Sequence, residues 1–420
     1  MTAISHVVLT ALLAIGPCAA IAAASTVALA QAQQAPAAAD THRMADASVA
    51  EWKLQLLEVA GAAATAMPAV PHVKTRCQLQ EDVVMALLTI GQPVRAEQLA
   101  DQIVNWRRGV AYGAIARHCG EHGWVGDADR LIAKAKAVLD STEVKQEQEW
   151  RQDAVRSAIA SALQAVGRKD AATQVAKRVV DPESGKLESL PLAPVATADL
   201  EAHFKVVDDA IQASNMDVLV TTLGICAQVF DRDYQDAKVR DACEAKIRSA
   251  RKRIPVQFNI DLLLKLADSA VAHQDRKKAV ALLHEAQELV TTSRWVAEDE
   301  VKTGARLATA IAAAGDLEGA KVQVRAAFAV FESSQKMIVD IWRAGCLRPI
   351  AEAWLRIGDP EKAGLFYGKA LEEGVANPNS RPRAQDLVAS CLSMVANGYA
   401  PDAAMLVRIQ AIGKGLGQPW

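Results

Sequence analysis

Aromatic residues are scarce in this chain, since Phe, Trp and Tyr together make up only 4% of its 420 residues. Hydrophobic residues nevertheless account for 51%, so the apolar content is mostly Ala, Val and Leu. This composition suits closely packed helices better than sheets, which favour aromatic side chains. The sequence therefore predicts an all-α protein.

The chain also lacks a strong excess of either charge, and its formal net charge is −2. Such a balance argues against an electrostatic grip on nucleic acid or on anionic lipid. No G-x-S-x-G motif, phosphate-binding glycine loop, dinucleotide fingerprint or calcium loop is evident. We therefore expect no nucleic-acid partner, no cofactor and no catalysis.

Asp, Glu, Lys and Arg are absent from residues 1–30, where a hydrophobic stretch from Val7 to Ile15 continues through Ala-rich sequence to Ala30. This pattern is typical of a secretory signal peptide, and we expect cleavage after Ala30; an uncleaved anchor is the alternative. No later run approaches the roughly 20 apolar residues of a membrane span. We predict secretion across the inner membrane to the periplasm, without membrane insertion after cleavage.

Cleavage removes one cysteine and leaves six, at positions 77, 119, 226, 243, 346 and 391. An even number in an oxidising compartment permits disulfides without proving any. The wide scatter of the six favours small buried core residues instead. If a disulfide forms, Cys226 with Cys243 is the first pair to test.

A glycine followed five residues later by alanine recurs along most of the chain, as in Gly315 with Ala320 and Gly358 with Ala363. The other glycines of this pattern are Gly91, Gly123, Gly167 and Gly398, and Gln274 falls in the same phase. A period near 40 residues indicates an array of paired helices. Glycine suits the left-handed end of one helix, and Asp316 or Asp359 can cap the next.

The segment from Ala363 to Leu371 resembles the second helix of the tetratricopeptide repeat family, with that family's spacing of small, aromatic and leucine residues. The resemblance covers about residues 75–180 and 256–415, with a period longer than the family's. It implies a right-handed superhelix of helical hairpins, an α-solenoid. It also implies a scaffold or adaptor for protein–protein interaction.

The array divides into blocks at a proline-rich stretch. The predicted organisation is a signal peptide (1–30), a disordered linker (31–45), N-terminal helical repeats (46–180), a proline-rich linker (181–197), C-terminal helical repeats (198–412) and a flexible tail (413–420). Three helices are expected between the linker and Pro255, at about 198–213, 216–230 and 234–251.

In the tetratricopeptide family, the first helix of each pair lines a groove that takes an extended peptide or a helix. The resemblance places these residues at groove-lining positions: Arg117, Ser157, Ser161, Gln164, Lys302, Thr309, Arg348 and Glu352. The lining is mixed in charge. We therefore expect a protein or peptide partner, located in the cell envelope.

Two other functions remain open. The segment from His118 to His122 matches the H-x-x-E-H form of some zinc peptidases, with Glu121 as the carboxylate, so a zinc-dependent hydrolase is one alternative. Against it, the segment is the last turn before Gly123, and no third ligand is identified. The second alternative is a structural component of a cell-envelope assembly.

Overall fold

The computed structural model describes residues 43–179 and 195–420, apart from residue 252. The predicted signal peptide, most of the predicted 31–45 linker and most of the proline-rich linker lie outside the described residues. Within those residues the chain forms nineteen α-helices and a short 3-10 turn at Thr197–Asp199, with no strand. The all-α prediction is confirmed.

The helices of the N-terminal half (residues 43–179) are α1 (Glu51–Ala66), α2 (Ala69–Thr89), α3 (Pro93–Ala100), α4 (Arg107–Glu121), α5 (Val125–Asp140), α6 (Thr142–Lys145), α7 (Glu149–Ala165) and α8 (Lys169–Ala176). Those of the C-terminal half (residues 195–420) are α9 (Leu200–Ala213), α10 (Met216–Arg232), α11 (Ala237–Ala250), α12 (Val256–Ala272), α13 (Arg276–Thr292), α14 (Ala297–Ala313), α15 (Leu317–Ser334), α16 (Asp340–Ile357), α17 (Pro360–Gly374), α18 (Ser380–Asn397) and α19 (Ala403–Lys414). The three helices expected before Pro255 are α9, α10 and α11.

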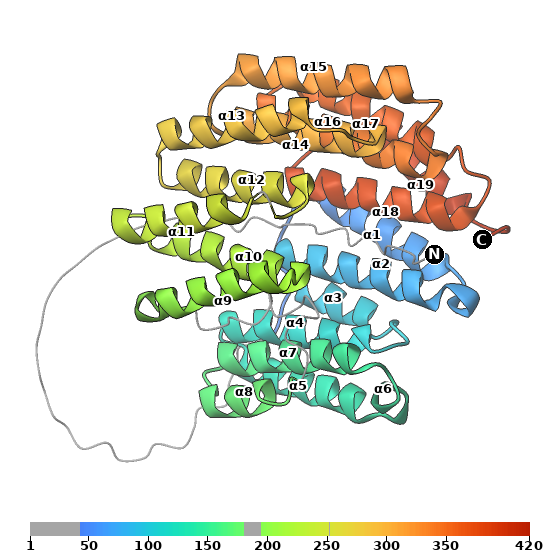
Figure 1. Cartoon of the computed structure of the whole chain (residues 1–420). Helices are drawn as coiled ribbons and strands as arrows, with labels where there is room; N and C mark the ends of the chain where they lie inside the picture. The colour runs from blue at the N-terminus through green and yellow to red at the C-terminus, as the bar shows by residue number, and fades with distance from the viewer. Residues whose placement is uncertain (1–42, 180–194, 252) are drawn as a thin grey trace, which may run out of the picture. The chain divides into compact units, whose positions relative to one another are not determined.

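Consecutive helices pack as hairpins, for example α4 with α5, α14 with α15 and α16 with α17 (Figure 1). The first helices of neighbouring hairpins also pack on one another, as α4 does on α7 and α14 on α16. We call α2, α4, α7, α10, α12, α14, α16 and α18 the first-layer helices, and their partners α3, α5, α8, α11, α13, α15, α17 and α19 the second-layer helices. The predicted array of helical hairpins is confirmed.

The turns between paired helices follow the chemistry that the sequence predicts. All six turn glycines have positive φ, and so does Gln274 (φ 62°), which replaces glycine at one turn. Asp316 accepts a hydrogen bond from the backbone N–H of Gly319 at 2.9 Å, and Asp359 accepts one from Lys362 at 3.0 Å. These carboxylates satisfy N–H groups that have no partner within the helix.

The first hairpins contain a close helix contact that the repeat pattern does not predict. A Cβ atom added at Gly113 of α4 would lie 2.6 Å from the Cβ of Ala158 in α7, and one at Gly109 would lie 2.7 Å from Val155. Both distances are shorter than real carbon contacts. Glycine on one face of α4 therefore sets how closely α4 and α7 pack.

The chain before α1 runs along the turns of the next two units. Ala47 donates its N–H to the carbonyl of Gly91 at 2.8 Å. Asp46 accepts a hydrogen bond from the N–H of Val94, in the first turn of α3, at 2.8 Å. Gln92, at the cap position of α3, provides no side-chain cap of its own. Asp46 thus supplies the cap from outside the hairpin.

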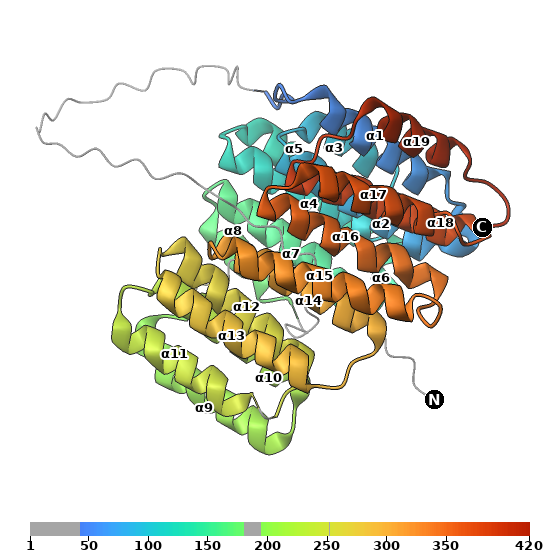
Figure 2. The same ribbon diagram turned by 90° about the horizontal axis from the view of Figure 1, so that it is seen from above.

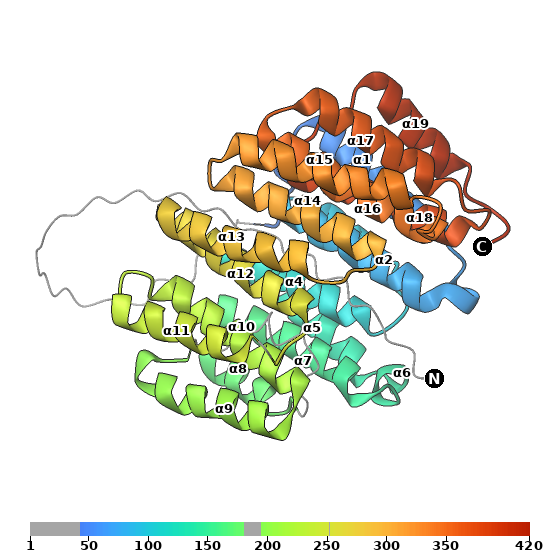
Figure 3. The ribbon, with the colours of Figure 1, turned by 45° about the horizontal axis from the view of Figure 1, so that its top comes forward.

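Helix α1 packs against α18 and α19, near the other end of the sequence, and α18 also contacts α2 (Figures 2 and 3). The C-terminal residues bind the start of α18, because Ser380 donates its N–H to the carbonyl of Pro419 at 2.8 Å. The N-terminal half and the C-terminal half therefore meet at α1 and α18.

All six described cysteines are buried free thiols, including Cys226 and Cys243. Burial raises the pKa of the Cys226 thiol to about 12 and that of the Cys243 thiol to about 11. These thiols behave as small core residues.

A search of the described helices finds none with the length and apolar content of a membrane span.

We predict that Gly113→Ala lowers the free energy of unfolding by about 1–3 kcal/mol, because the added methyl group forces α4 away from α7. Urea denaturation followed by circular dichroism measures this loss. The control is Gly126→Ala in α5, where nothing lies within 4 Å of the added Cβ. That change should be neutral, or stabilising by up to about 1 kcal/mol. Equal effects of the two substitutions would contradict the close-contact explanation.

Candidate functional site

The residues predicted to line a groove in the N-terminal half are not gathered into one site. Arg117 is exposed and binds Glu121 of its own helix, with 2.7 Å between Nε and the carboxylate oxygen. Ser157 and Ser161 of α7 are buried, whereas Gln164 is exposed. This half therefore offers no continuous polar surface at the predicted positions.

The predicted residues of the C-terminal half lie on adjacent first-layer helices. Lys302 is on α14, and Arg348 and Glu352 are on α16. The ammonium group of Lys302 lies 5.1 Å from the ring centre of Trp342 at the start of α16. Thr309 instead donates its hydroxyl to the carbonyl of Ala305 in its own helix, at 3.2 Å.

Arg348 and Glu352 both reach α18. The guanidinium of Arg348 donates to the carboxylate of Asp386 at 2.9 Å, and both side chains are largely buried. Ser393 donates its hydroxyl to Glu352 at 2.5 Å and lies 2.9 Å from the hydroxyl of the fully buried Tyr367. These contacts connect two first-layer helices and a second-layer helix.

Further charged residues, which the sequence did not predict as part of the site, lie next to these. Asp261, Lys265 and Asp268 recur every three or four positions on α12, which places them on one side of that helix. Arg306 of α14 forms an ion pair with Asp261 at 2.8 Å. Arg356 follows Glu352 one turn later on α16. The helical spacing of these charged residues could have identified them in the sequence. They were not predicted, because the family resemblance placed none of them in the groove.

We call these residues the charged face: Asp261, Lys265 and Asp268 of α12; Lys302 and Arg306 of α14; and Arg348, Glu352 and Arg356 of α16. Figure 3 shows the three helices next to one another. The positive charges of Arg306 and Arg356 both act to lower the pKa of Asp268. Those of Arg306 and Arg348 both act to lower the pKa of Glu352. Asp268, Glu352 and the three arginines of the face are therefore electrostatically connected.

The protein environment weakens the negative charge of this face. Solvent reaches the Asp268 side chain, yet desolvation raises the pKa of Asp268 to about 6 against the lowering effect of Arg306 and Arg356. Burial also raises the pKa of Glu352, and that of Asp386 beside Arg348. Desolvation disfavours charged carboxylates, whereas arginine keeps its charge throughout the ordinary pH range.

Three exposed members of the charged face form neither a hydrogen bond nor an ion pair among the described residues. In the described parts of the chain, Lys265, Asp268 and Arg356 make no hydrogen bond or ion pair, and all three are exposed. Arg306 keeps unused donors, because it contacts Asp261 as an ion pair without a hydrogen bond of good geometry and its side chain is 46% exposed. These groups are available to a ligand.

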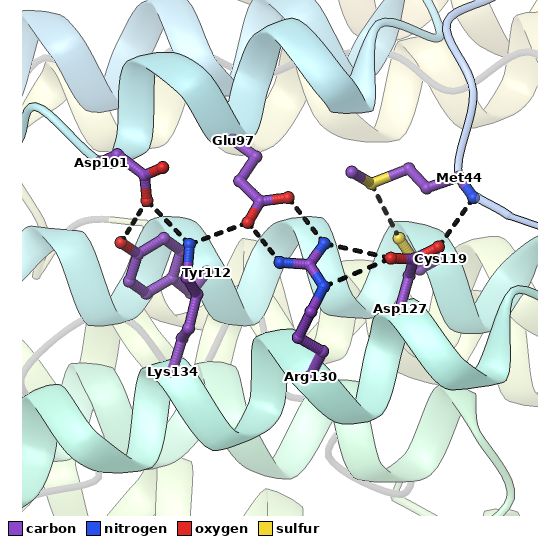
Figure 4. Close-up of polar contacts among 8 residues, drawn as sticks. All are labelled: Met44, Glu97, Asp101, Tyr112, Cys119, Asp127, Arg130 and Lys134. Atoms are coloured by element: carbon purple, nitrogen blue, oxygen red, sulfur yellow. Dashed lines mark hydrogen bonds and ion pairs between the residues drawn. The ribbon is translucent and has the colours of Figure 1, made fainter.

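A second polar cluster, between α3 and α5, contrasts with the charged face (Figure 4). Arg130 donates to both oxygens of Glu97, at 2.5 and 2.7 Å, and also to Asp127. Lys134 bridges Glu97 and Asp101 at 2.8 and 2.9 Å. Because each charge here has an opposite partner, we assign this cluster to holding adjacent second-layer helices together.

The Glu97 cluster makes stability depend on pH. Hydrogen bonds from Arg130 and Lys134 lower the pKa of Glu97 from 4.5 to about 2, against the opposing effect of burial. The folded state therefore binds this proton more weakly than the unfolded state. The stabilisation is complete above pH 4.5 and is lost as the pH falls toward 2.

We predict that Glu97→Gln removes stability on the order of 3 kcal/mol above pH 5 and very little near pH 2. The wild type should lose stability between these pH values more steeply than the variant, as urea denaturation at a series of pH values will measure. Glu58→Gln is the control, since Glu58 also accepts from an arginine but is 62% exposed. Parallel pH profiles for wild type and Glu97→Gln would refute this role.

The H-x-x-E-H segment has a geometry of its own at the end of α4. The rings of His118 and His122 stack with centres 4.2 Å apart, and the ring of Trp124 stacks on His122 at 5.0 Å. Glu121 is held by Arg117. A search of the described residues finds no group of three potential metal ligands. The stacked rings of His118 and His122 and the paired carboxylate of Glu121 therefore do not form a set of ligands around one metal position.

Comparisons with known proteins add little. No protein-family model and no curated protein matches the sequence. Among solved structures, the apo form of the quorum sensor NprR from B. thuringiensis matches with 8% identity over 78% of this chain and 83% of that chain, at a TM-score of 0.25. Ton1535 from Thermococcus onnurineus NA1 matches with 15% identity over 74% and 90%, at 0.21. A circular tandem repeat protein with novel repeat topology and enhanced subunit contact surfaces matches with 14% identity over 86% and 94%, at 0.28. These TM-scores are too low to support a conclusion about the fold or the function of the present chain.

Proposed function

We propose that this protein is a non-catalytic scaffold or adaptor that binds an acidic, extended segment of another protein on its charged face. The observation that carries this proposal is the set of unpaired charges on adjacent first-layer helices: Lys265 and Arg356, together with the spare donors of Arg306. Five of the eight residues of the face are basic.

Charge complementarity favours an acidic partner. Arginine donates in a fork that matches the two oxygens of a carboxylate. The acidic residues of the face compete weakly for these donors, because desolvation raises the pKa of both Asp268 and Glu352. Since the net charge of the whole chain is −2, the attraction is local to this surface.

The architecture supports an extended partner. Side chains on α12, α14 and α16 are presented by rigid helices that pack side by side, so a segment crossing all three would contact each in turn. We also propose that the array is a divergent tetratricopeptide repeat, in which Lys302, Arg348 and Glu352 occupy positions of the family's groove.

We predict that a fluorescently labelled peptide of alternating Glu and Ala, with blocked termini, binds the purified protein more tightly than its Gln and Ala counterpart. Arg356→Ala and Lys265→Ala should each weaken binding of the Glu peptide about 5- to 10-fold, through loss of a charge-assisted contact. Asp268→Asn should strengthen it by removing a competing negative charge. Fluorescence anisotropy titrations measure all five affinities.

The control variant is Lys136→Ala, which removes an exposed lysine from second-layer helix α5 and should leave the affinity unchanged. Because Lys265, Asp268 and Arg356 make no internal polar contact within the described residues, their substitution should not disturb the fold. Equal binding of the Glu and Gln peptides, or the same affinity for all variants, would refute the proposal.

We further propose that the protein acts in the periplasm, because the uncharged, apolar composition of residues 1–30 is typical of a signal peptide. Expressed from its full sequence in a Gram-negative bacterium, the protein should appear in the periplasmic fraction. Mass spectrometry should give a mature N-terminus at Gln31. Retention of residues 1–30, or recovery only from the cytoplasm, would contradict this location.

A further inference from the structure

Helix α16 contains a proline, Pro349, well inside its length. Proline has no backbone N–H, so it cannot donate to the carbonyl of the residue four positions earlier, which here is Gly345. Proline also destabilises a helix interior more than any other residue. The helix nevertheless continues through Pro349 to Ile357. Pro349 therefore leaves the Gly345 carbonyl without the donor that a helix normally supplies.

Gly345 and Pro349 lie on the same side of α16 as the charged face. Their spacing of three or four positions from Arg348, Glu352 and Arg356 places them on that side. Both residues are partly exposed. Among the described residues, no side chain donates a hydrogen bond to the Gly345 carbonyl. This side of α16 therefore presents a main-chain acceptor as well as charged side chains.

The missing side chain of Gly345 leaves space beside two cations. A Cβ atom added at Gly345 would lie 3.5 Å from Nη2 of Arg348 and 3.8 Å from Cε of Lys302. Both are ordinary van der Waals distances, so the position is open rather than filled by a neighbour. Glycine at such a position lets a ligand approach the helix backbone closely.

The Lys302 side chain has unused donors at this place. Its ammonium group lies 5.1 Å from the ring centre of Trp342, a cation–π contact that uses no N–H group in a hydrogen bond. In the described parts of the chain the partly buried Lys302 forms neither a hydrogen bond nor an ion pair. An ammonium group with three N–H donors thus lies next to a carbonyl acceptor.

An extended acidic segment carries the matching groups. Each of its residues other than proline has a main-chain N–H, and its acidic side chains supply carboxylates. In a partner helix these N–H groups would be bonded within the helix, whereas in an extended segment they are available. The pairing of one acceptor with one cation therefore favours an extended partner over a helical one.

We propose that the Gly345 carbonyl accepts a hydrogen bond from a main-chain N–H of the acidic partner, while Lys302 binds the carboxylate of an adjacent side chain. This contact rests on the proposed function, because it needs the acidic segment, and it adds recognition of the peptide backbone to recognition of charge. A partner with proline at the contacting position binds more weakly.

Pro349→Ala tests the contact, because alanine supplies the N–H that occupies the Gly345 carbonyl. Wild type and variant are titrated by fluorescence anisotropy with the Glu and Ala peptide of blocked termini. Two further peptides carry esters: lactic acid replaces each Ala in one, and 2-hydroxyglutaric acid replaces each Glu in the other. Each ester peptide thus lacks every second main-chain N–H and keeps its side chains.

We expect Pro349→Ala to bind the all-amide peptide about 3- to 10-fold more weakly than wild type, through loss of one hydrogen bond. With one of the two ester peptides, wild type and Pro349→Ala should bind equally, because the donor is already absent. The thermal midpoint of Pro349→Ala should equal or exceed that of wild type, since alanine suits a helix interior better.

Gly345→Leu tests the same place without changing the proline. Its side chain fills the space beside Lys302 and should weaken binding of the all-amide peptide by a similar factor. The matched control is Gly368→Leu in second-layer helix α17, where nothing lies within 4 Å of an added Cβ. The control should bind as wild type does.

The outcomes separate this contact from the charged face as a whole. If Arg356→Ala weakens binding but Pro349→Ala and Gly345→Leu do not, the face stands and the Gly345 contact is wrong. An equal loss for Pro349→Ala with all three peptides would also overturn the contact. If wild type does not bind the all-amide peptide, both proposals fail.

Discussion

The close approach of successive first-layer helices is the constraint on which the rest of this structure depends. Glycine and alanine make it possible, as where Gly113 of α4 meets Ala158 of α7. Small side chains bury little area each, but they let whole helix faces touch. An array built this way places polar side chains of adjacent helices within reach of one another.

The charged face is a consequence of that approach. Arg306 forms an ion pair with Asp261 on the preceding first-layer helix, α12. Arg348 forms one with Asp386 on the following first-layer helix, α18. These pairs neutralise some of the surface charges, whereas Lys265, Asp268 and Arg356 make no hydrogen bond or ion pair in the described parts of the chain. A repeat protein can thus use one kind of side chain both to join its units and to present charge to a ligand.

Local chemistry made the fold predictable from the sequence. Glycine at a left-handed turn and aspartate at the following cap are local requirements, so Gly358 and Asp359 identify their turn without knowledge of the rest of the chain. The packing of α1 on α18 was not predictable, because it joins segments from opposite ends of the sequence. Capping of α3 by Asp46 was missed for a similar reason.

The candidate site was predicted only in part. Lys302, Arg348 and Glu352 were named from the family resemblance, and they do lie on adjacent helices. The resemblance did not include the α12 stripe, and spacing alone cannot distinguish a charged surface that binds from one that is merely solvated. Which charges remain unpaired depends on contacts between helices, and these became visible only in the folded protein.

Hydrogen–deuterium exchange with and without the bound acidic peptide tests most directly whether the charged face is the binding surface. On binding, we expect slower exchange in the first-layer helices α12, α14 and α16 and little change in the first-layer helices α4 and α7. Protection confined to other helices, or no protection at saturating peptide, would contradict binding at the charged face.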